Sequence, residues 1–113
     1  MSNNPAIAFK ALGDPIRLRL FYLLSQQSEL CVCHLTDALH LPQSTVSRHL
    51  GLMRHAGLVT TRRDGKWMYY RLNGEVAGML AGMIGQLADD TLLNDARQLT
   101  DTLQGFSPPC PSS

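Results

Sequence analysis

The spacing of apolar residues changes twice along this chain, and this change most constrains how the chain can fold. Up to residue 57 apolar side chains recur every three to four positions, which predicts amphipathic helices. Residues 58–63 and 66–72 instead form two β-type runs, joined by Asp64-Gly65, a dipeptide that favours a tight type I′ hairpin turn. Helical spacing returns after Asn73, a common N-cap residue. The sequence therefore predicts a mainly α fold with a small β-hairpin.

The helical part of the sequence carries start and stop signals. Asp14 followed by Pro15 supplies an N-cap and a proline at the first helical position. The segment His40-Leu41-Pro42 separates two helices as a short turn, and Gly57 ends the second of them as a C′ glycine. We expect helices over residues 5–12, 15–24, 30–40, 43–55, 73–87 and 92–103, the last of which continues or follows the one before.

The length of 113 residues corresponds to one domain with a modest core. We expect this domain over residues 1–105, followed by a proline-rich tail over residues 106–113. No stretch reaches the roughly 18–20 uncharged apolar residues of a membrane helix, and the N-terminus lacks the pattern of a secretory signal. These features predict a cytoplasmic protein with no membrane partner, whose three cysteines are free thiols or ligands.

The basic residues gather in the middle of the chain. Residues 48–71 hold six lysines and arginines against Asp64 alone, a local charge of +5, whereas residues 72–113 have a local charge of −4. Two helices joined by a short turn and followed by a basic two-stranded hairpin make a winged helix-turn-helix. The position of the charge on these elements favours a surface for double-stranded operator DNA over an ordinary solvated face.

In a winged helix-turn-helix the second helix of the pair enters the major groove, and here that helix is residues 43–55. Its early positions offer donors and acceptors to base edges and phosphates, although one of Ser44 and Thr45 is expected to cap the helix. The hairpin places basic side chains beside the groove, where they neutralise phosphates. The expected DNA-binding residues are Gln43, Ser44, Thr45, Ser47, Arg48 and His49 on the helix and Arg62, Arg63 and Lys66 on the wing.

Four segments of the chain resemble the ArsR/SmtB family of metal-sensing repressors. They read ALGDPIRLRLFYLL, ELCVCHLTDAL, STVSRHLGLMRHAGLV and RRDGKWMYYRL, each on the expected element over residues 6–88. The resemblance implies a homodimer that is formed by the first and last helices and releases operator DNA on binding a toxic metal or metalloid. The last long helix carries an apolar stripe that we expect in a dimer interface, formed by Val76, Met79, Leu80, Met83 and Leu87. Small residues beside this stripe separately favour a helix–helix interface, because glycine costs up to about 1 kcal/mol in a helix interior.

The segment from Glu29 to Leu35 matches the family's cysteine-containing signature, with Cys31 and Cys33 on the helix before the recognition helix. Thiolates select soft or borderline ions, and a helix N-terminus lowers the pKa of a thiol. The match therefore implies arsenite or antimonite as the inducer, with cadmium or lead as alternatives. The simpler interpretation is a pair of buried cysteines that act as small hydrophobes. On a regular helix the two side chains would point about 200° apart, so we expect a shared ion to distort the start of this helix.

The signature lacks a third cysteine, because Thr36 stands where the arsenic-sensing pattern has one. Cys110 in the proline-rich tail, His34, Asp37 and an exogenous thiol are the candidates for the third ligand. Residues 75–104 contain no histidine, which argues against the tetrahedral zinc site of the family's zinc-sensing branch.

Three other interpretations of the thiols stay open. Cadmium and lead sensors of the family carry further cysteines near the N-terminus, and residues 1–30 have none. A thiol redox switch would use Cys31 and Cys33 with Cys110 as the disulfide partner. A DNA-binding protein without an effector would tolerate loss of all three thiols. An enzyme is not expected, because Cys31 and His34 have no third orienting group and the chain has no glycine-rich phosphate loop.

Overall fold

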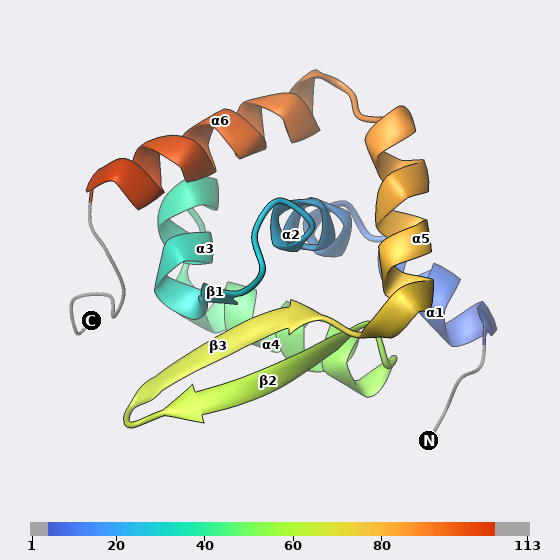
Figure 1. Ribbon diagram of the computed structural model, residues 1–113, viewed down its shortest axis with the longest axis horizontal. Helices are drawn as coiled ribbons and strands as arrows, with labels where there is room; N and C mark the ends of the chain where they lie inside the picture. Colours follow the sequence, from blue (N-terminus) through green and yellow to red (C-terminus); the bar gives the residue numbers. More distant parts are fainter. Residues whose placement is uncertain (1–4, 106–113) are drawn as a thin grey trace.

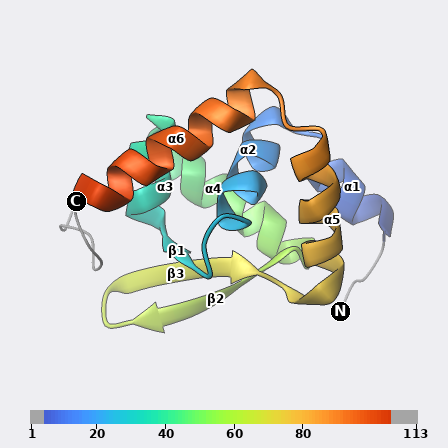
Figure 2. The same cartoon turned by 45° about the horizontal axis from the view of Figure 1, so that its top comes forward.

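The computed structural model describes residues 5–105, apart from the side chain of residue 76. The helices pack together, and a small sheet with its hairpin lies along one side of them (Figures 1 and 2). The described elements follow in the order α1 (Pro5–Leu12), α2 (Pro15–Leu24), β1 (Leu30–Cys31), α3 (Val32–Leu39), α4 (Gln43–His55), β2 (Val59–Asp64), β3 (Trp67–Leu72), α5 (Gly74–Gln86) and α6 (Asp90–Gly105). This order confirms the predicted winged helix-turn-helix, in which α3 and α4 are the helix pair and β2 and β3 are the wing.

Helix α2 begins as the sequence predicts. Pro15 is its first residue, and the Asp14 carboxylate accepts hydrogen bonds from the backbone N–H groups of Ile16 at 2.8 Å and Arg17 at 3.2 Å. Helix α3 differs from its prediction, because it begins at Val32 and not at residue 30. The two residues before it form strand β1 instead.

The three strands of the described residues form an antiparallel sheet in the order β1-β3-β2. The hairpin register runs from Val59 opposite Leu72 to Asp64 opposite Trp67. Strand β1 adds two pairs on the other edge of β3, of which one joins Cys31 to Tyr69. The sequence predicted only the hairpin, since a two-residue strand is too short to show alternation. The consequence is that the segment with the thiols is part of the wing's sheet.

The turn of the hairpin lies one residue later than predicted. Because Asp64 pairs with Trp67, the two loop residues are Gly65 and Lys66 rather than Asp64 and Gly65. Gly65 has a φ of +64°, and Lys66 is not among the described residues with positive φ. Positive φ at the first loop position alone is the pattern of a type II′ turn, so the expected type I′ turn is wrong.

The main core lies between α2, α3, α4 and α6. Its fully buried side chains include Leu20, Phe21, Leu23, Leu35, Val46, Leu50, Met53 and Leu99. Helix α6 is separate from α5 and packs across α3 and α2, on the side of the molecule away from the wing (Figures 1 and 2). The Asp95 carboxylate of α6 is 2% exposed and accepts two hydrogen bonds from the Arg19 guanidinium of α2, at 2.8 and 3.0 Å. Helix α6 thus packs on both α2 and α3 and holds them in place.

Helix α5 buries one face and leaves the other exposed. Ala77 is buried and Leu80 packs against the main core, whereas Met79, Met83 and Leu87 are 70%, 60% and 78% exposed. The sequence predicted that Leu80 faces a second subunit together with Met79, Met83 and Leu87. In the structure Leu80 packs instead against the core of its own subunit. Within the described residues, no helix has both the length and the apolar character needed to cross a membrane.

Candidate functional site

Helix α4 presents a polar face at its N-terminal end. The exposed or half-buried polar residues of this face are Gln43, Ser44, Thr45, Ser47 and Arg48. Val46, Leu50 and Met53 lie on the opposite, fully buried face, which holds the helix against the core. This anchoring leaves the polar face on the outside of the molecule, as a helix that enters a groove requires.

His49 does not belong to that polar face. Its side chain is 5% exposed, because position 49 falls on the same helical stripe as Val46 and Met53. The Arg17 guanidinium lies 3.2 Å from its Nδ1 atom. Burial and the nearby positive charges of Arg48 and Arg17 lower the pKa of His49, against an opposing effect of Asp14. The prediction that His49 is exposed on this helix is therefore wrong, and its role in DNA binding stays a prediction.

The start of α4 leaves its early hydroxyls outside the capping position. The N-cap residue is Pro42, with a φ of −60° and a ψ of 145°, and no side chain caps the helix there. Ser44 and Thr45 follow inside the first turn, so the expectation that one of them is the N-cap is wrong. Both hydroxyls lie where the first turn of the helix exposes its backbone N–H groups.

On the wing, Arg62 is held by a carboxylate of its own subunit. Its guanidinium donates to both oxygens of Glu29, with 3.2 Å from Nε to Oε2 and a shorter contact from Nη2 to Oε1. The guanidinium also lies 4.6 Å above the centre of the Tyr69 ring. The hydrogen bond from Arg62 lowers the pKa of Glu29, so this carboxylate stays charged at neutral pH. The sequence did not identify Glu29 as a partner, because 33 residues separate the pair.

The other two basic residues of the wing point into solvent. Arg63 and Lys66 are both exposed, and Lys66 lies at the tip of the hairpin. The Lys66 ammonium is 5.7 Å from the centre of the Trp67 ring, a distance at which a cation–π contact contributes weakly. Of the three predicted wing cations, these two have no ion pair with an acidic side chain of the described residues within 4.0 Å.

The two thiols of the signature converge. Cys31 is the last residue of β1 and the N-cap of α3, with an extended backbone at φ −86° and ψ 162°, and Cys33 is the second residue of the helix. Their Sγ atoms lie 2.6 Å apart. The premise that both cysteines lie on a regular helix is wrong, since the extended N-cap turns Cys31 toward Cys33. The two sulfurs are in direct contact, so no unwinding of α3 is needed to bring them together.

His34 packs against Cys31 and orients it. The imidazole is 1% exposed, and its Nδ1 atom accepts the backbone N–H of Cys31 at 3.4 Å and lies 3.4 Å from the Cys31 Sγ atom. Burial lowers the pKa of His34, against an opposing effect of the Asp37 charge, so the ring is neutral at physiological pH. A neutral ring that accepts at Nδ1 carries its proton on Nε2.

The other expected third ligands are not gathered around the sulfurs. Asp37 accepts a hydrogen bond from the Thr102 hydroxyl of α6 at 2.6 Å, and the Thr36 hydroxyl donates to the Cys33 carbonyl oxygen at 2.9 Å. Among the described residues there is no group of three His, Cys, Asp or Glu side chains placed to hold a metal ion. Cys110 lies outside the described residues.

A cavity of about 250 Å³ opens beside the two sulfurs, and we call it the thiol pocket. Its residues come from the start of α3, the start of α4 and the tip of the wing. They are Cys31, Val32, Cys33, Gln43, Lys66, Trp67 and Met68. Cys31 and Tyr69 form a small buried cluster on which Cys33 and Trp67 pack. The thiols therefore share one cavity with the first residue of the recognition helix and with the tip of the wing. The sequence analysis did not identify Trp67 or Met68, because no local pattern brings them to residues 31–33.

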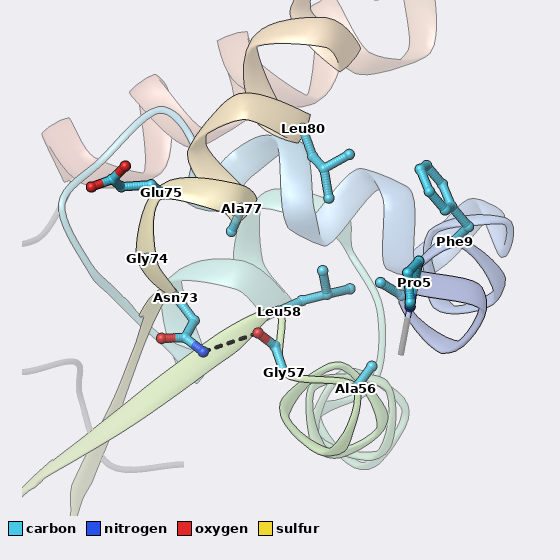
Figure 3. Close-up of a pocket in the computed structure, with 11 residues that line it drawn as sticks. Pro5, Phe9, Ala56, Gly57, Leu58, Asn73, Gly74, Glu75, Ala77 and Leu80 are labelled. Atoms are coloured by element: carbon cyan, nitrogen blue, oxygen red, sulfur yellow. Dashed lines mark hydrogen bonds between the residues drawn. The ribbon is translucent and has the colours of Figure 1, made fainter. Parts of the chain in front are cut away.

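A second cavity, of about 480 Å³, lies between α1, the end of α4 and the start of α5. Figure 3 shows its lining, with Phe9 of α1 and Leu80 of α5 on its walls and the Asn73 amide donating to the Gly57 carbonyl oxygen. The lining is mostly apolar and contains no cysteine or histidine. Exposed apolar side chains of α1 and α5 lie nearby, among them Phe9 at 60%.

Known proteins resemble this chain in sequence and in fold. A family profile described as "Bacterial regulatory protein, arsR family" matches residues 14–61. The arsenic resistance transcriptional regulator ArsR1 of Pseudomonas putida is 43% identical over 101 residues, which cover 87% of this chain and 79% of that protein. The arsenical resistance operon repressor of Escherichia coli is 44% identical over 82 residues, which cover 73% of this chain and 70% of that protein.

A solved structure shares the same architecture. The homodimeric winged helix-turn-helix DNA-binding domain of Mb0332 from Mycobacterium bovis, described as a possible ArsR-family transcriptional regulator, matches with a TM-score of 0.67. It is 34% identical and the match covers 77% of this chain and 80% of that domain.

Proposed function

This chain belongs to the ArsR family of bacterial regulatory proteins, and from that premise we propose that it represses transcription as a homodimer until trivalent arsenic or antimony binds Cys31 and Cys33. Members of this family are DNA-binding transcriptional regulators and not enzymes. The observation that carries the proposal is the pair of sulfurs 2.6 Å apart in a cavity that also touches α4 and the wing.

In this proposal the operator is read by the polar face of α4. Gln43, Ser44 and Arg48 contact base edges and phosphates, with Thr45 and Ser47 at the edge of the contact. The wing cations Arg63 and Lys66 neutralise phosphates beside the groove. A dimer buries the exposed apolar face of α5 and places two such helices on successive half-sites.

The inducer exchanges its oxygen ligands for sulfur. Each of two bonds from arsenic to hydroxide breaks, each thiol sulfur forms a bond to arsenic, and the two thiol protons leave with the hydroxides as water. No electrons are transferred, so the thiols have to be reduced before the exchange. Soft thiolates favour trivalent arsenic and antimony over hard cations, which supports this class of inducer. The third bond goes either to Cys110 or to a group from outside the chain.

Induction follows from the place of the thiol pocket. Its walls include Gln43 of α4 and Lys66 of the wing, both of which lie on the proposed DNA-binding surface. An inducer bound to the two sulfurs displaces or holds these side chains, so it binds more tightly to the free protein than to the DNA complex. Such a difference in affinity between two states is what releases the operator.

The test is the release of a labelled operator by arsenite, antimonite, cadmium, zinc or peroxide, followed by fluorescence anisotropy. Cys31→Ser and Cys33→Ser are expected to keep operator binding and to lose the response to arsenite. Cys110→Ser tests the source of the third ligand, because it weakens the response only if the tail supplies that ligand. A full arsenite response in both Cys31→Ser and Cys33→Ser would refute the proposed inducer site.

The sulfur–sulfur contact favours one second candidate function, a thiol redox switch. Peroxide takes two electrons from Cys31 and Cys33, a disulfide bond forms between their Sγ atoms, and two water molecules result. This candidate predicts operator release by peroxide without metalloid, and its reversal by a dithiol reductant. Release by arsenite under strongly reducing conditions separates the two functions, because a disulfide cannot persist there.

A further inference from the structure

Arg17, in the first turn of α2, joins three helices through its side chain. Its Nε atom donates to the carbonyl oxygen of Ala11 at the end of α1, at 2.7 Å, and its Nη1 atom lies 3.2 Å from Nδ1 of His49 on α4. The backbone of Arg17 is held in turn by the Asp14 carboxylate, which accepts its N–H at 3.2 Å. Arg17 therefore bridges the end of α1 and the middle of α4, and we call these contacts the Arg17 bridge.

The hydrogen bond between Arg17 and His49 has only one possible direction. A guanidinium keeps its proton and only donates, so Nδ1 of the imidazole is the acceptor. A ring that accepts at Nδ1 and is neutral carries its proton on Nε2. Because His49 is 5% exposed, water does not readily replace Arg17 if this hydrogen bond is lost.

The neighbourhood of the Arg17 bridge is loosely filled. The cavity of about 480 Å³ lies between α1 and the end of α4, with Phe9 on one wall and Ala56 and Gly57 on another (Figure 3). Side chains do not close this space, so packing holds α1 and the end of α4 less firmly than it holds a filled core. The polar contacts of Arg17 are a direct link between the two helices.

We propose that Arg17 is a positioning residue for operator binding, which fixes α4 relative to α1 through a neutral His49. This inference rests on the proposed function, in which the polar face of α4 reads the operator. Helix α4 is one element, so a shift at His49 also moves Ser44 and Arg48 relative to the base edges. A dimer reads two half-sites at a fixed spacing, so the same shift in both subunits misplaces both recognition helices.

Protonation of His49 breaks the Arg17 bridge. The proton takes the Nδ1 lone pair that accepts from Arg17 and adds a positive charge beside the guanidinium. The charged side chains that act on the ring are Asp14 and Arg17 at the start of α2 and Arg48 on α4, and within the described residues none comes from α1, α3 or β2. Burial is the main cause that lowers the pKa of His49, so the ring is neutral at neutral pH and gains its proton only below the ordinary histidine value of 6.5. The DNA complex holds α4 in place, so the free protein takes up this proton more easily and acid favours dissociation.

The first part of the test measures operator anisotropy at neutral pH with the reduced full-length protein. Arg17→Met keeps the aliphatic stem without a donor, and His49→Leu keeps an apolar side chain without an acceptor. Each is expected to weaken operator binding roughly tenfold, as the loss of one charge-assisted hydrogen bond does. The double variant is expected to bind no more weakly than the weaker single variant, because both changes remove the same bridge. Far-UV circular dichroism in the assay buffer shows whether each variant is folded.

The second part of the test compares the affinity of each protein at about pH 5.5 with its own affinity at neutral pH. The wild type is expected to lose roughly tenfold in acid, since one proton changes the affinity by up to tenfold for each pH unit below its pKa. His49→Gln retains an acceptor that does not titrate in this range, and it is expected to lose this acid dependence. His55→Gln, at an exposed position of the same helix, is the matched control and is expected to retain it.

The inference is overturned if the wild type shows no loss in acid, or if His49→Gln shows the same loss as the wild type. Arg17→Met that binds the operator as tightly as the wild type would also overturn it, as would losses of Arg17→Met and His49→Leu that add in the double variant. These outcomes leave the proposed function intact. A wild type that does not bind the operator at neutral pH refutes the proposed function, and the inference fails with it.

Discussion

Glu29 holds the guanidinium of Arg62 on the wing, and removing the charge of Glu29 is expected to strengthen operator binding. The two side chains share two hydrogen bonds, and the guanidinium also lies on the Tyr69 ring. A guanidinium held by these contacts is less available to a phosphate. Glu29→Gln keeps the size of the side chain and weakens its hold on Arg62, which becomes available to the DNA backbone.

The size of the effect follows from counterion release. Each phosphate that is neutralised changes the slope of log K against log salt by about −0.9. At 0.1 M salt this contact therefore raises the affinity by roughly eightfold relative to 1 M salt, where the contribution vanishes. A dimer has two wings, so Glu29→Gln is expected to steepen the slope by about 1.8 and to raise the affinity by roughly 60-fold. The ion pair is exposed to solvent, so the fold tolerates its loss.

The assay is operator anisotropy over a range of salt concentrations. Asp101→Asn, at an exposed position of α6 and away from the wing (Figure 1), changes the net charge by the same amount and is the matched control. The double variant Glu29→Gln with Arg62→Gln is expected to return to the slope of the wild type. The reasoning is refuted if Glu29→Gln and Asp101→Asn have the same slope, or if Arg62→Gln alone flattens the slope as much as Arg63→Gln does.

Two further predictions concern assembly and stability. Met83→Asp places a charge on the exposed face of α5 without touching the core, so it is expected to give monomers in sedimentation velocity and to abolish tight operator binding. A variant that remains dimeric at micromolar concentration would place the interface elsewhere. Asp95→Ala leaves Arg19 without its carboxylate and is expected to lower the free energy of unfolding by about 2–3 kcal/mol, below the usual 3–5 kcal/mol for a buried pair because Arg19 is 28% exposed. Urea denaturation measures this, and Asp101→Asn on the same helix should stay within about 0.5 kcal/mol of the wild type.

The sequence was sufficient for the elements whose signals are local. The Asp14-Pro15 pair marked the start of α2 because an N-cap and its two hydrogen bonds involve adjacent residues. The change of period after Gly57 marked the wing, since two β-type runs flank a turn signal, and the structure pairs six residues of each strand. The homodimeric winged helix-turn-helix of the related structure has the same architecture.

The sequence failed where a residue depends on a distant part of the chain. Strand β1 has two residues and exists only because it pairs with β3, so Cys31 was predicted on a helix. The partner of Arg62 was missed, because the pairing of β1 with β3 brings Glu29 beside it. The burial of His49 had a local signal, because position 49 falls on the same helical stripe as Val46 and Met53. The signal was missed because histidine is polar.

The corrected geometry of the thiols changes how induction can work, since α3 does not have to unwind. To shift an operator complex from 99% bound to 99% free, the inducer has to favour the free state by about 10⁴-fold, or roughly 100-fold for each of two thiol pockets. Loss of a phosphate contact by Lys66 supplies about eightfold at 0.1 M salt. Loss of a base contact by Gln43 supplies a further 1–3 kcal/mol, or roughly 5- to 150-fold. Both side chains line the pocket, and the two losses together amount to roughly 40- to 1,200-fold for each pocket, a range that includes the roughly 100-fold required.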